Sequence, residues 1–218
     1  MRISEGWSDN TYRPVQPVQR NAMAAFLYRA AGSPAFTAPT RASFTDVPVG
    51  APFFREIEWM KAAGITTGYR DNTFRPYDPI NRDAMAAFLY RASGSPAFTP
   101  PTRARFSDVP VGTAFRTEIE WLASTGTTTG YADGTYRPLS PVNRDAMAAF
   151  LYRLAGSPAF TPTAQSFVDV APGVQFYAEM SWLAASGITT GWPGASNCPV
   201  FRPLQPINRD AMAAFLYR

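Results

Sequence analysis

Apolar residues recur at helical spacing in three places along the chain. Phe53, Ile57 and Met60 stand at positions i, i+4 and i+7, and the same pattern returns at 115–122 and 176–183. This spacing predicts an amphipathic helix that begins near Phe53, Phe115 or Phe176 and buries one apolar stripe. A glycine marks the predicted C-terminal end of each helix, at Gly64, Gly126 and Gly187.

A second helical pattern lies in the phrase NRDAMAAFLYR, which occupies 81–91, 143–153 and 208–218, with QRNAMAAFLYR at 19–29. Met85, Phe88 and Leu89 form its apolar stripe, and the alanines between them allow another backbone to come close. Asparagine suits the N-cap and the following aspartate suits the positive helix end. These residues are Asn81, Asn143 and Asn208, with Asp83, Asp145 and Asp210. Gly32, Gly94 and Gly156 are predicted to close three of the helices.

The two patterns alternate as a tandem repeat with a period of 62 residues, which is the spacing from Arg20 to Arg82 and from Arg82 to Arg144. The fourth copy of this arginine, Arg209, follows 65 residues after Arg144. Complete units span 44–93, 106–155 and 167–218, joined by Pro/Thr-rich linkers at 32–43, 94–105 and 156–166. The stretch 1–31 holds only the second half of a unit. The sequence therefore predicts a mostly α protein made of helix–loop–helix repeats.

The half unit raises a question of packing, because it lacks a first helix. Its apolar residues Met23, Phe26 and Leu27 need a partner. They either cap the complete units of the same chain or meet another chain in an oligomeric contact.

The loop between the two helices of each unit reads as a tight turn. Asp71 and Asp133 suit Asx-type turn bonds, and Asn72 or Gly134 suits a positive φ. One carboxylate per loop is too few for a hard-cation site, so we expect no metal. The last loop, at 192–203, is four residues longer and carries Cys198, which we interpret as incidental.

Composition removes several classes of function. The 218 residues contain no histidine and one cysteine, which excludes histidine-based catalysis and an internal disulfide. A net charge of +4 without a clustered basic face argues against nucleic-acid binding. No apolar run is long enough to span a membrane. We expect no cofactor, and any export signal would lie outside these residues.

Catalysis by paired carboxylates is also unexpected. Glu56 with Glu58, and Glu118 with Glu120, are repeated pairs, but residues two apart on a helix point about 200° apart and cannot flank one bond. We interpret them as solvated charges on the helix face and predict that the chain is not an enzyme.

The repeated arginine at the first turn of the second helix is the most informative residue, because a cation there opposes the helix dipole. One explanation is an anion bound between the arginine fork and free helical N–H groups. The alternative is an ion pair with an aspartate of a neighbouring unit, such as Asp46 or Asp108. The tryptophans Trp59, Trp121 and Trp182 likewise have two interpretations, as cover for a neighbouring repeat or as a ligand-facing wall.

The motifs FTDV (44–47), GITTGY (64–69), RDNTFRP (70–76) and INRDA (80–84) stand in the order found in the S-layer homology domain family. The chain resembles this family over nearly its whole length. The resemblance implies a pseudo-threefold arrangement in which the second helices form a central bundle. It also implies a non-catalytic module at the bacterial cell wall or S-layer that binds a secondary cell-wall polysaccharide, often acidic and pyruvylated, in grooves between units.

The resemblance assigns ligand-binding roles by position. They fall on Arg20, Arg82, Arg144 and Arg209, on Asp46, Asp108 and Asp169, and on Gly68, Gly130 and Gly191. Tyr69, Tyr131 and Trp192, which follow these glycines, are candidates to stack on a sugar face, and the alternative is that they are core residues. The family's T-R-A-E reads N-R-D-A here, so the acidic residue has moved one position around the helix. The rival function is a structural or oligomerisation module of a larger exported protein, with the arginines in ion pairs between repeats.

Overall fold

A computed structural model describes residues 17–194, 199–208 and 211–212. Within these residues the regular structure consists of six α-helices and no strands, with four isolated β-bridges. The helices are α1 (Arg20–Ala30), α2 (Phe54–Ala62), α3 (Arg82–Ala92), α4 (Arg116–Ser124), α5 (Arg144–Leu154) and α6 (Tyr177–Ala185). The prediction of a mostly α chain of tandem helical repeats is confirmed. The threefold arrangement stays a prediction.

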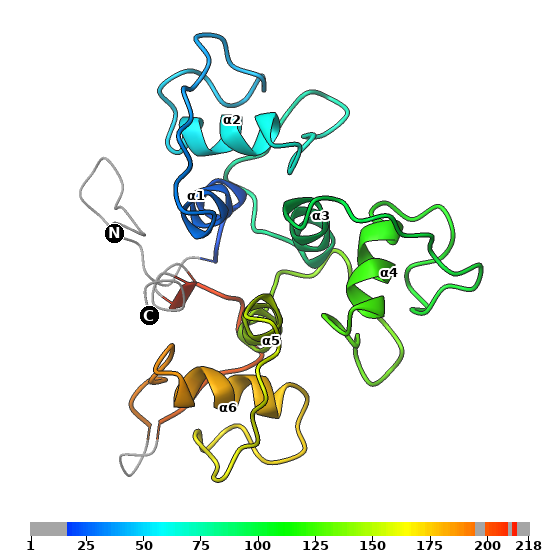
Figure 1. Cartoon of the computed structure of the whole chain (residues 1–218), viewed down its shortest axis with the longest axis vertical. Helices are drawn as coiled ribbons and strands as arrows, with labels where there is room; N and C mark the ends of the chain where they lie inside the picture. The colour runs from blue at the N-terminus through cyan, green and yellow to red at the C-terminus, as the bar shows by residue number, and fades with distance from the viewer. Residues whose placement is uncertain (1–16, 195–198, 209–210, 213–218) are drawn as a thin grey trace. The chain divides into compact units, whose positions relative to one another are not determined.

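The chain divides into two compact units, and the described part of the first runs from 17 to 141 and that of the second from 142 onward. In the first unit α1 packs against α2 and α3 packs against α4; in the second unit α5 packs against α6 (Figure 1). Each packed pair therefore joins the second helix of one sequence repeat to the first helix of the next. The packing is offset by half a repeat from the sequence motif.

This offset answers the question raised by the half unit. Helix α1 belongs to residues 1–31, and its partner α2 belongs to the first complete unit. Met23 and Phe26 are buried within this chain, while Leu27 is half-buried. The ring of Tyr28 meets Trp59 edge-to-face at 5.2 Å, and its hydroxyl donates to the Pro34 carbonyl at 2.7 Å, which fixes the exit of the linker. The apolar face of the half repeat is thus covered in cis.

The first helices begin one residue later than the apolar pattern suggested. Phe53 is the N-cap of α2 and has a φ of 61°, and Phe115 and Phe176 have the same left-handed conformation. Phe53 is predicted to be in the core but is only half-buried. Phe54 is buried there instead, together with Ile57 and Met60. The rest of the predicted stripe is confirmed, and so are the glycine ends of the helices.

The second helices bury their apolar stripe as expected, with Met85, Phe88 and Leu89 each no more than 3% exposed. Asn81 and Asn143 occupy the N-cap positions, but their side chains make no capping hydrogen bond. Instead, carbonyl groups in the loop of the following repeat accept the first N–H groups of these helices. Asn208 lies at the corresponding position, while Asp210 is outside the described residues.

The loop of each repeat is shaped by local hydrogen bonds. The Asp71 carboxylate accepts the N–H of Thr73, and Asp133 accepts the N–H of Thr135, as predicted for Asx-type turns. Asn72 has a φ of 60° and Gly134 a φ of 76°, which confirms the expected left-handed positions. This turn places the FRP segment against the start of the preceding second helix. Cys198 lies outside the described residues.

Candidate functional site

Arg20 stands at the first position of α1, and its guanidinium reaches into the loop of the following repeat. Its Nε–H donates to the main-chain oxygen of Phe74 at 2.8 Å. The guanidinium carbon lies 5.0 Å from the ring centre of Tyr69 and 4.8 Å from that of Phe74. The ring centre of Phe88 lies 5.4 Å from the same carbon. Arg20 is only 5% exposed. A buried arginine is therefore held by one carbonyl and three rings, which are favourable partners for a weakly hydrated cation.

The same arrangement recurs at the next two arginines. Arg82 donates from Nε to the Tyr136 carbonyl at 2.8 Å, and Arg144 donates to the Phe201 carbonyl at 2.7 Å. Arg82 lies over the ring of Tyr131, and Arg144 lies over a larger ring at the corresponding position, that of Trp192, at 4.1 Å. Arg209 falls outside the described residues.

The hypothesis of free helical N–H groups beside the arginine is wrong for α1, α3 and α5. In α1 the first two N–H groups donate to the carbonyls of Asp78 and Pro76, and that of Ala22 donates to the Asn21 side chain at 2.6 Å. The corresponding groups of α3 and α5 have corresponding partners. The loop of the next repeat covers each helix start. An anion near these helices would therefore meet the arginine rather than the helix end.

The alternative ion pair with an aspartate of a neighbouring unit is not observed either. In the described part of the chain, no ion pair joins Arg20 or Arg82 to Asp46 or Asp108. Asp46 instead accepts the N–H groups of Phe74 and Arg75 at 2.8 and 2.7 Å. Asp108 and Asp169 bind the same two positions of their own loops. These carboxylates hold the loop in place, and their part in ligand binding stays a prediction.

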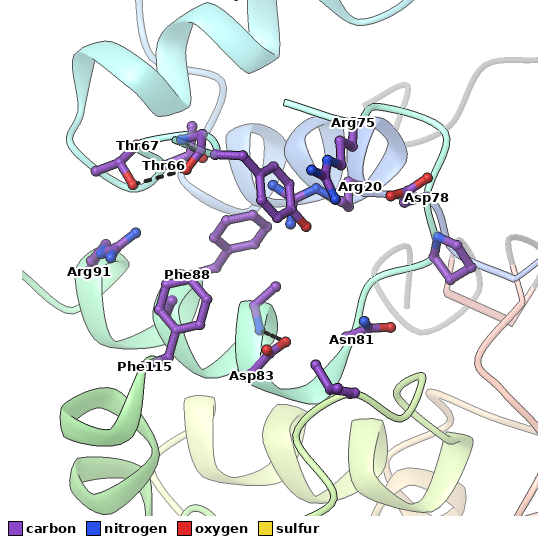
Figure 2. Close-up of a pocket in the computed structure, with 16 residues that line it drawn as sticks. Arg20, Thr66, Thr67, Arg75, Asp78, Asn81, Asp83, Phe88, Arg91 and Phe115 are labelled. Atoms are coloured by element: carbon purple, nitrogen blue, oxygen red, sulfur yellow. Dashed lines mark hydrogen bonds between the residues drawn. The ribbon is translucent and has the colours of Figure 1, made fainter. Parts of the chain in front are cut away.

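A cavity of about 260 Å³ opens beside Arg20, and we call it the Arg20 groove. It lies within the first unit. Figure 2 shows Arg20, Arg75 and Asp78 on the side of the loop, with Asp83, Asn81 and Phe88 across from them. The lining residues are Arg20, Thr66, Thr67, Gly68, Tyr69, Arg75, Asp78, Pro79, Asn81, Asp83, Ala84, Ala87, Phe88, Arg91, Phe115 and Leu139.

Charges of both signs act on one another in this groove. Burial lowers the pKa of the Arg20 guanidinium, and the nearby Tyr69, Asp78 and Asp83 oppose that shift. Burial also raises the pKa of the Asp83 carboxyl, although the Ala84 N–H and the charge of Arg20 favour its ionised form. Arg91 is neutralised by an ion pair with Glu118 at 3.2 Å. The groove thus contains a buried cation and a partly buried carboxylate close enough to influence each other.

The predicted glycine Gly68 is required by the local structure. Its φ is 71°, and a Cβ there would overlap the ring of Phe44 and lie 2.8 Å from the carbonyl oxygen of Thr73. Gly130 and Gly191 have the same conformation and the same crowding. The backbone packs so closely against the phenylalanine of the FxDV motif that each of these three positions requires glycine. Contact of the glycines with a ligand stays a prediction.

The predicted aromatic residues differ in what they cover. Tyr69 is 38% exposed and lies beneath Arg75, whose guanidinium carbon is 4.0 Å from its ring centre. Tyr131 and Trp192 are half-buried and stack in the same way with Arg137 and Arg202. Arginine therefore lies over each of these rings. Tyr69 also lines the Arg20 groove, and stacking of these rings on a sugar stays a prediction.

The tryptophans cover a neighbouring repeat. Trp59 packs on Tyr28, and the matching contacts are Trp121 with Tyr90 at 5.2 Å and Trp182 with Tyr152 at 5.3 Å. Each contact joins a first helix to the second helix of the preceding repeat. The structural interpretation is confirmed, and ligand contact by the tryptophans stays a prediction.

The interpretation of the glutamates as solvated charges is wrong for Glu58 and Glu120. Glu58 is 2% exposed and accepts hydrogen bonds from the N–H and the hydroxyl of Ser43 at 2.8 and 2.6 Å. Glu120 is 1% exposed and accepts the N–H of Arg105 at 2.9 Å. These side chains cap the start of the FxDV segment. Both positions would be solvated on an isolated helix, but here the linker folds back over the helix and covers them.

Several residues of the groove were missed by the sequence reasoning. The sequence predicts for Asp83 only a role at the helix end. It predicts no site role for Asp78, Arg75, Arg91 or Leu139. Leu139 is 75% exposed at the groove, and Tyr77 and Leu204 hold the same position after the FRP motif in their own repeats. The recurrence of an apolar residue directly after FRP is the sequence feature from which a role for Leu139 could have been predicted.

None of the helices that the structure describes is both long and apolar enough to cross a membrane. In the same residues, no three acidic or cysteine side chains come together as a metal site would require.

Comparison with known proteins agrees with this architecture. A family model described as the S-layer homology domain matches residues 43–86, 105–148 and 166–213, which is more than half of the chain. The chain is also 27% identical to cell surface glycoprotein 1 of Acetivibrio thermocellus over 173 residues. The match covers 72% of this chain and 7% of that relative, so the chain spans a small part of the relative's length.

Proposed function

The chain belongs to the S-layer homology domain family, and from this premise we propose that it anchors an exported protein by binding an acidic secondary cell-wall polysaccharide. S-layer homology domains are in general non-catalytic cell-wall anchoring modules that bind cell-wall glycans. The family and the surface glycoprotein relative point to association with the cell surface or cell wall. The acidic polysaccharide, its pyruvylation and the residues that bind it are our proposal.

The observation that carries the proposal is the environment of Arg20. Its Nε is held by the Phe74 carbonyl, and among the described residues its two terminal nitrogens have no hydrogen-bond acceptor. The residue is nevertheless 95% removed from solvent and lines a cavity. A buried guanidinium with unused donors gains most from an acid group that can accept two parallel hydrogen bonds. A uronate or pyruvate-ketal carboxylate has that geometry.

The remainder of the groove suits a sugar ring. Tyr69, Phe88, Phe115 and Leu139 supply apolar surface, and Thr67 and Asn81 supply exposed or half-exposed polar groups. A volume of about 260 Å³ accommodates one monosaccharide-sized group rather than an extended chain. We propose the same role for Arg82, Arg144 and Arg209 with their associated aromatic residues Tyr131 and Trp192.

The test is co-sedimentation of the chain with cell walls of its own bacterium, either native or stripped of secondary polysaccharide. We expect the chain to bind native walls and to lose that binding on stripped walls. Tyr69→Ala and Arg20→Lys should weaken binding. Arg41→Ala removes one charge from an exposed linker position outside the groove and serves as the matched control. Equal binding to stripped walls would overturn the proposal.

The rival function, self-association, rested on an uncovered half repeat. Helix α1 is buried against α2 of the same chain, which argues against a swapped contact through α1. Sedimentation velocity at several protein concentrations tests self-association directly. A sedimentation coefficient that rises with concentration would revive the assembly function.

A further inference from the structure

Asp83 lies across the Arg20 groove from Arg20, on the first turn of the neighbouring helix α3 (Figure 2). Its Oδ1 accepts the N–H of Ala84 at 2.6 Å, which fixes the orientation of the carboxylate. Besides the N–H of Asp83 itself, no other group of the described residues donates a hydrogen bond to this carboxylate. Its bonds therefore come from the start of its own helix, and it has acceptor capacity that no side chain uses.

Arg20 and Asp83 carry opposite charges and line the same cavity, yet they do not form an ion pair in the described part of the chain. A hydrogen bond orients each side chain: Arg20 donates to the Phe74 carbonyl, and Asp83 accepts from the Ala84 amide. The protein thus holds a donor and an acceptor on opposite walls of the groove without letting them meet. Such a cavity favours a ligand that presents both kinds of group at once.

We propose that Asp83 is a specificity-determining residue, which accepts a hydrogen bond from a hydroxyl or amino group on the saccharide whose acid group meets Arg20. This inference rests on the function proposed above and narrows its ligand. The class is an acidic saccharide with a free donor close to its carboxylate. A ligand that offers only negative charge would face Asp83 and Asp78 in the same groove and bind less well.

The charge balance of the groove supports this choice. Arg20 is opposed by Asp78 and Asp83, while Arg75 is already paired with Asp71 and Arg91 with Glu118. The groove therefore has little net positive charge, unlike a site built for a dense polyanion. The partly buried Asp83 also loses hydration without gaining a side-chain partner, so a ligand donor would replace a missing hydrogen bond.

The experiment uses the whole chain labelled with ¹⁵N and wall polysaccharide released from its own bacterium. The polysaccharide is prepared untreated, with carboxyl groups reduced, with amines converted to phthalimides so that no N–H remains, or with hydroxyls O-methylated. Amide shifts of Gly68 and Ala84 report binding in the Arg20 groove separately from other sites. Asp83→Asn keeps the size of the side chain and the acceptor for Ala84. Asp145→Asn changes the corresponding residue of α5 and is the matched control.

We expect Asp83→Asn to weaken binding in the Arg20 groove about 10-fold, since a hydrogen bond to a charged group is lost. Asp145→Asn should leave that affinity unchanged. Blocking the ligand's donors should weaken binding to the original chain and have little further effect on Asp83→Asn. Loss with the phthalimide form identifies an amino group, and loss with the O-methylated form identifies a hydroxyl.

The two levels of the proposal fail in different ways. If carboxyl reduction abolishes binding while donor blocking and Asp83→Asn do not, the inference about Asp83 is overturned and the anchoring function stands. If the original chain does not bind untreated polysaccharide, the proposed function itself fails. Should Asp83→Asn unfold, the donor-blocked polysaccharides decide the question with the unaltered chain, because unchanged affinity for both overturns the inference.

Discussion

The Nε of Arg20 donates a hydrogen bond to the main-chain oxygen of Phe74 over 2.8 Å, and this contact ties helix α1 to the loop of the next repeat. Phe74 is fully buried and Arg20 nearly so. The Nε of Arg20 therefore stabilises the fold, while the same side chain also lines the groove.

Arg20→Lys should lower the free energy of unfolding by about 1–3 kcal/mol, because lysine lacks the Nε donor and leaves a buried carbonyl unsatisfied. Urea denaturation followed by circular dichroism measures the loss. Arg41→Ala, in the exposed linker, should shift the midpoint little. Equal midpoints for Arg20→Lys and the unaltered chain would mean that the contact with Phe74 does not stabilise the fold.

Gly68→Ala should be more destabilising than Gly64→Ala, although the two glycines share nearly the same φ, 71° and 70°. At Gly64 a Cβ has no atom within 4 Å, so the substitution carries only the backbone cost of about 1–2 kcal/mol. At Gly68 the Cβ would also overlap Phe44, which adds about 1–3 kcal/mol.

Thermal melting of the two variants isolates the packing cost, because the backbone cost is common to both. Gly68→Ala should melt at the lower temperature. If the two variants melt together, the close approach of Phe44 to the glycine backbone does not constrain this position.

Regular features of the repeat could be predicted from the sequence because they depend on local chemistry. Helix ends followed from glycines such as Gly64, and the turn followed from Asp71 and Asn72, whose preferences act within a few residues. The family resemblance and the tandem helical fold followed from motif order. These features do not require knowledge of which helices touch.

Contacts between repeats could not be predicted from these local sequence features. Motif boundaries place α1 and α2 in different units, yet these two helices pack together. Glu58 looked solvated because its partner Ser43 lies 15 residues away in a linker. Asp83 joined the groove only because α3 faces a loop from the preceding part of the chain. Long-range placement decided each of these roles, and spacing along one helix cannot supply it.

Glu58→Gln should destabilise the chain by about 1–3 kcal/mol, because the buried carboxylate accepts two hydrogen bonds from Ser43 and the amide can accept only at one atom. Urea denaturation measures this loss. The control is a double-mutant cycle with Ser43→Ala, which removes the hydroxyl donor. Strictly additive effects of the two substitutions would show that the side chains are not coupled.

Asp133 should titrate at an unusually low pH in the folded chain. The hydroxyl of Thr135, the guanidinium of Arg137 and the N–H of Thr135 all donate to its carboxylate, and they lower its pKa to about 2. An unfolded aspartate has a pKa of about 3.9. The folded pKa is the lower of the two, so the stabilisation is fully present above the unfolded value and is lost as pH falls toward 2.

The carboxyl carbon shift of Asp133, followed by NMR from pH 7 to 2, gives the pKa directly. Thr135→Val removes the hydroxyl that contributes most and should move the midpoint upward toward the ordinary value. An Asp133 midpoint that coincides with that of an unstructured aspartate would mean that the loop hydrogen bonds do not form in solution. The turn that presents the Tyr136 carbonyl to Arg82 would then need another source of order.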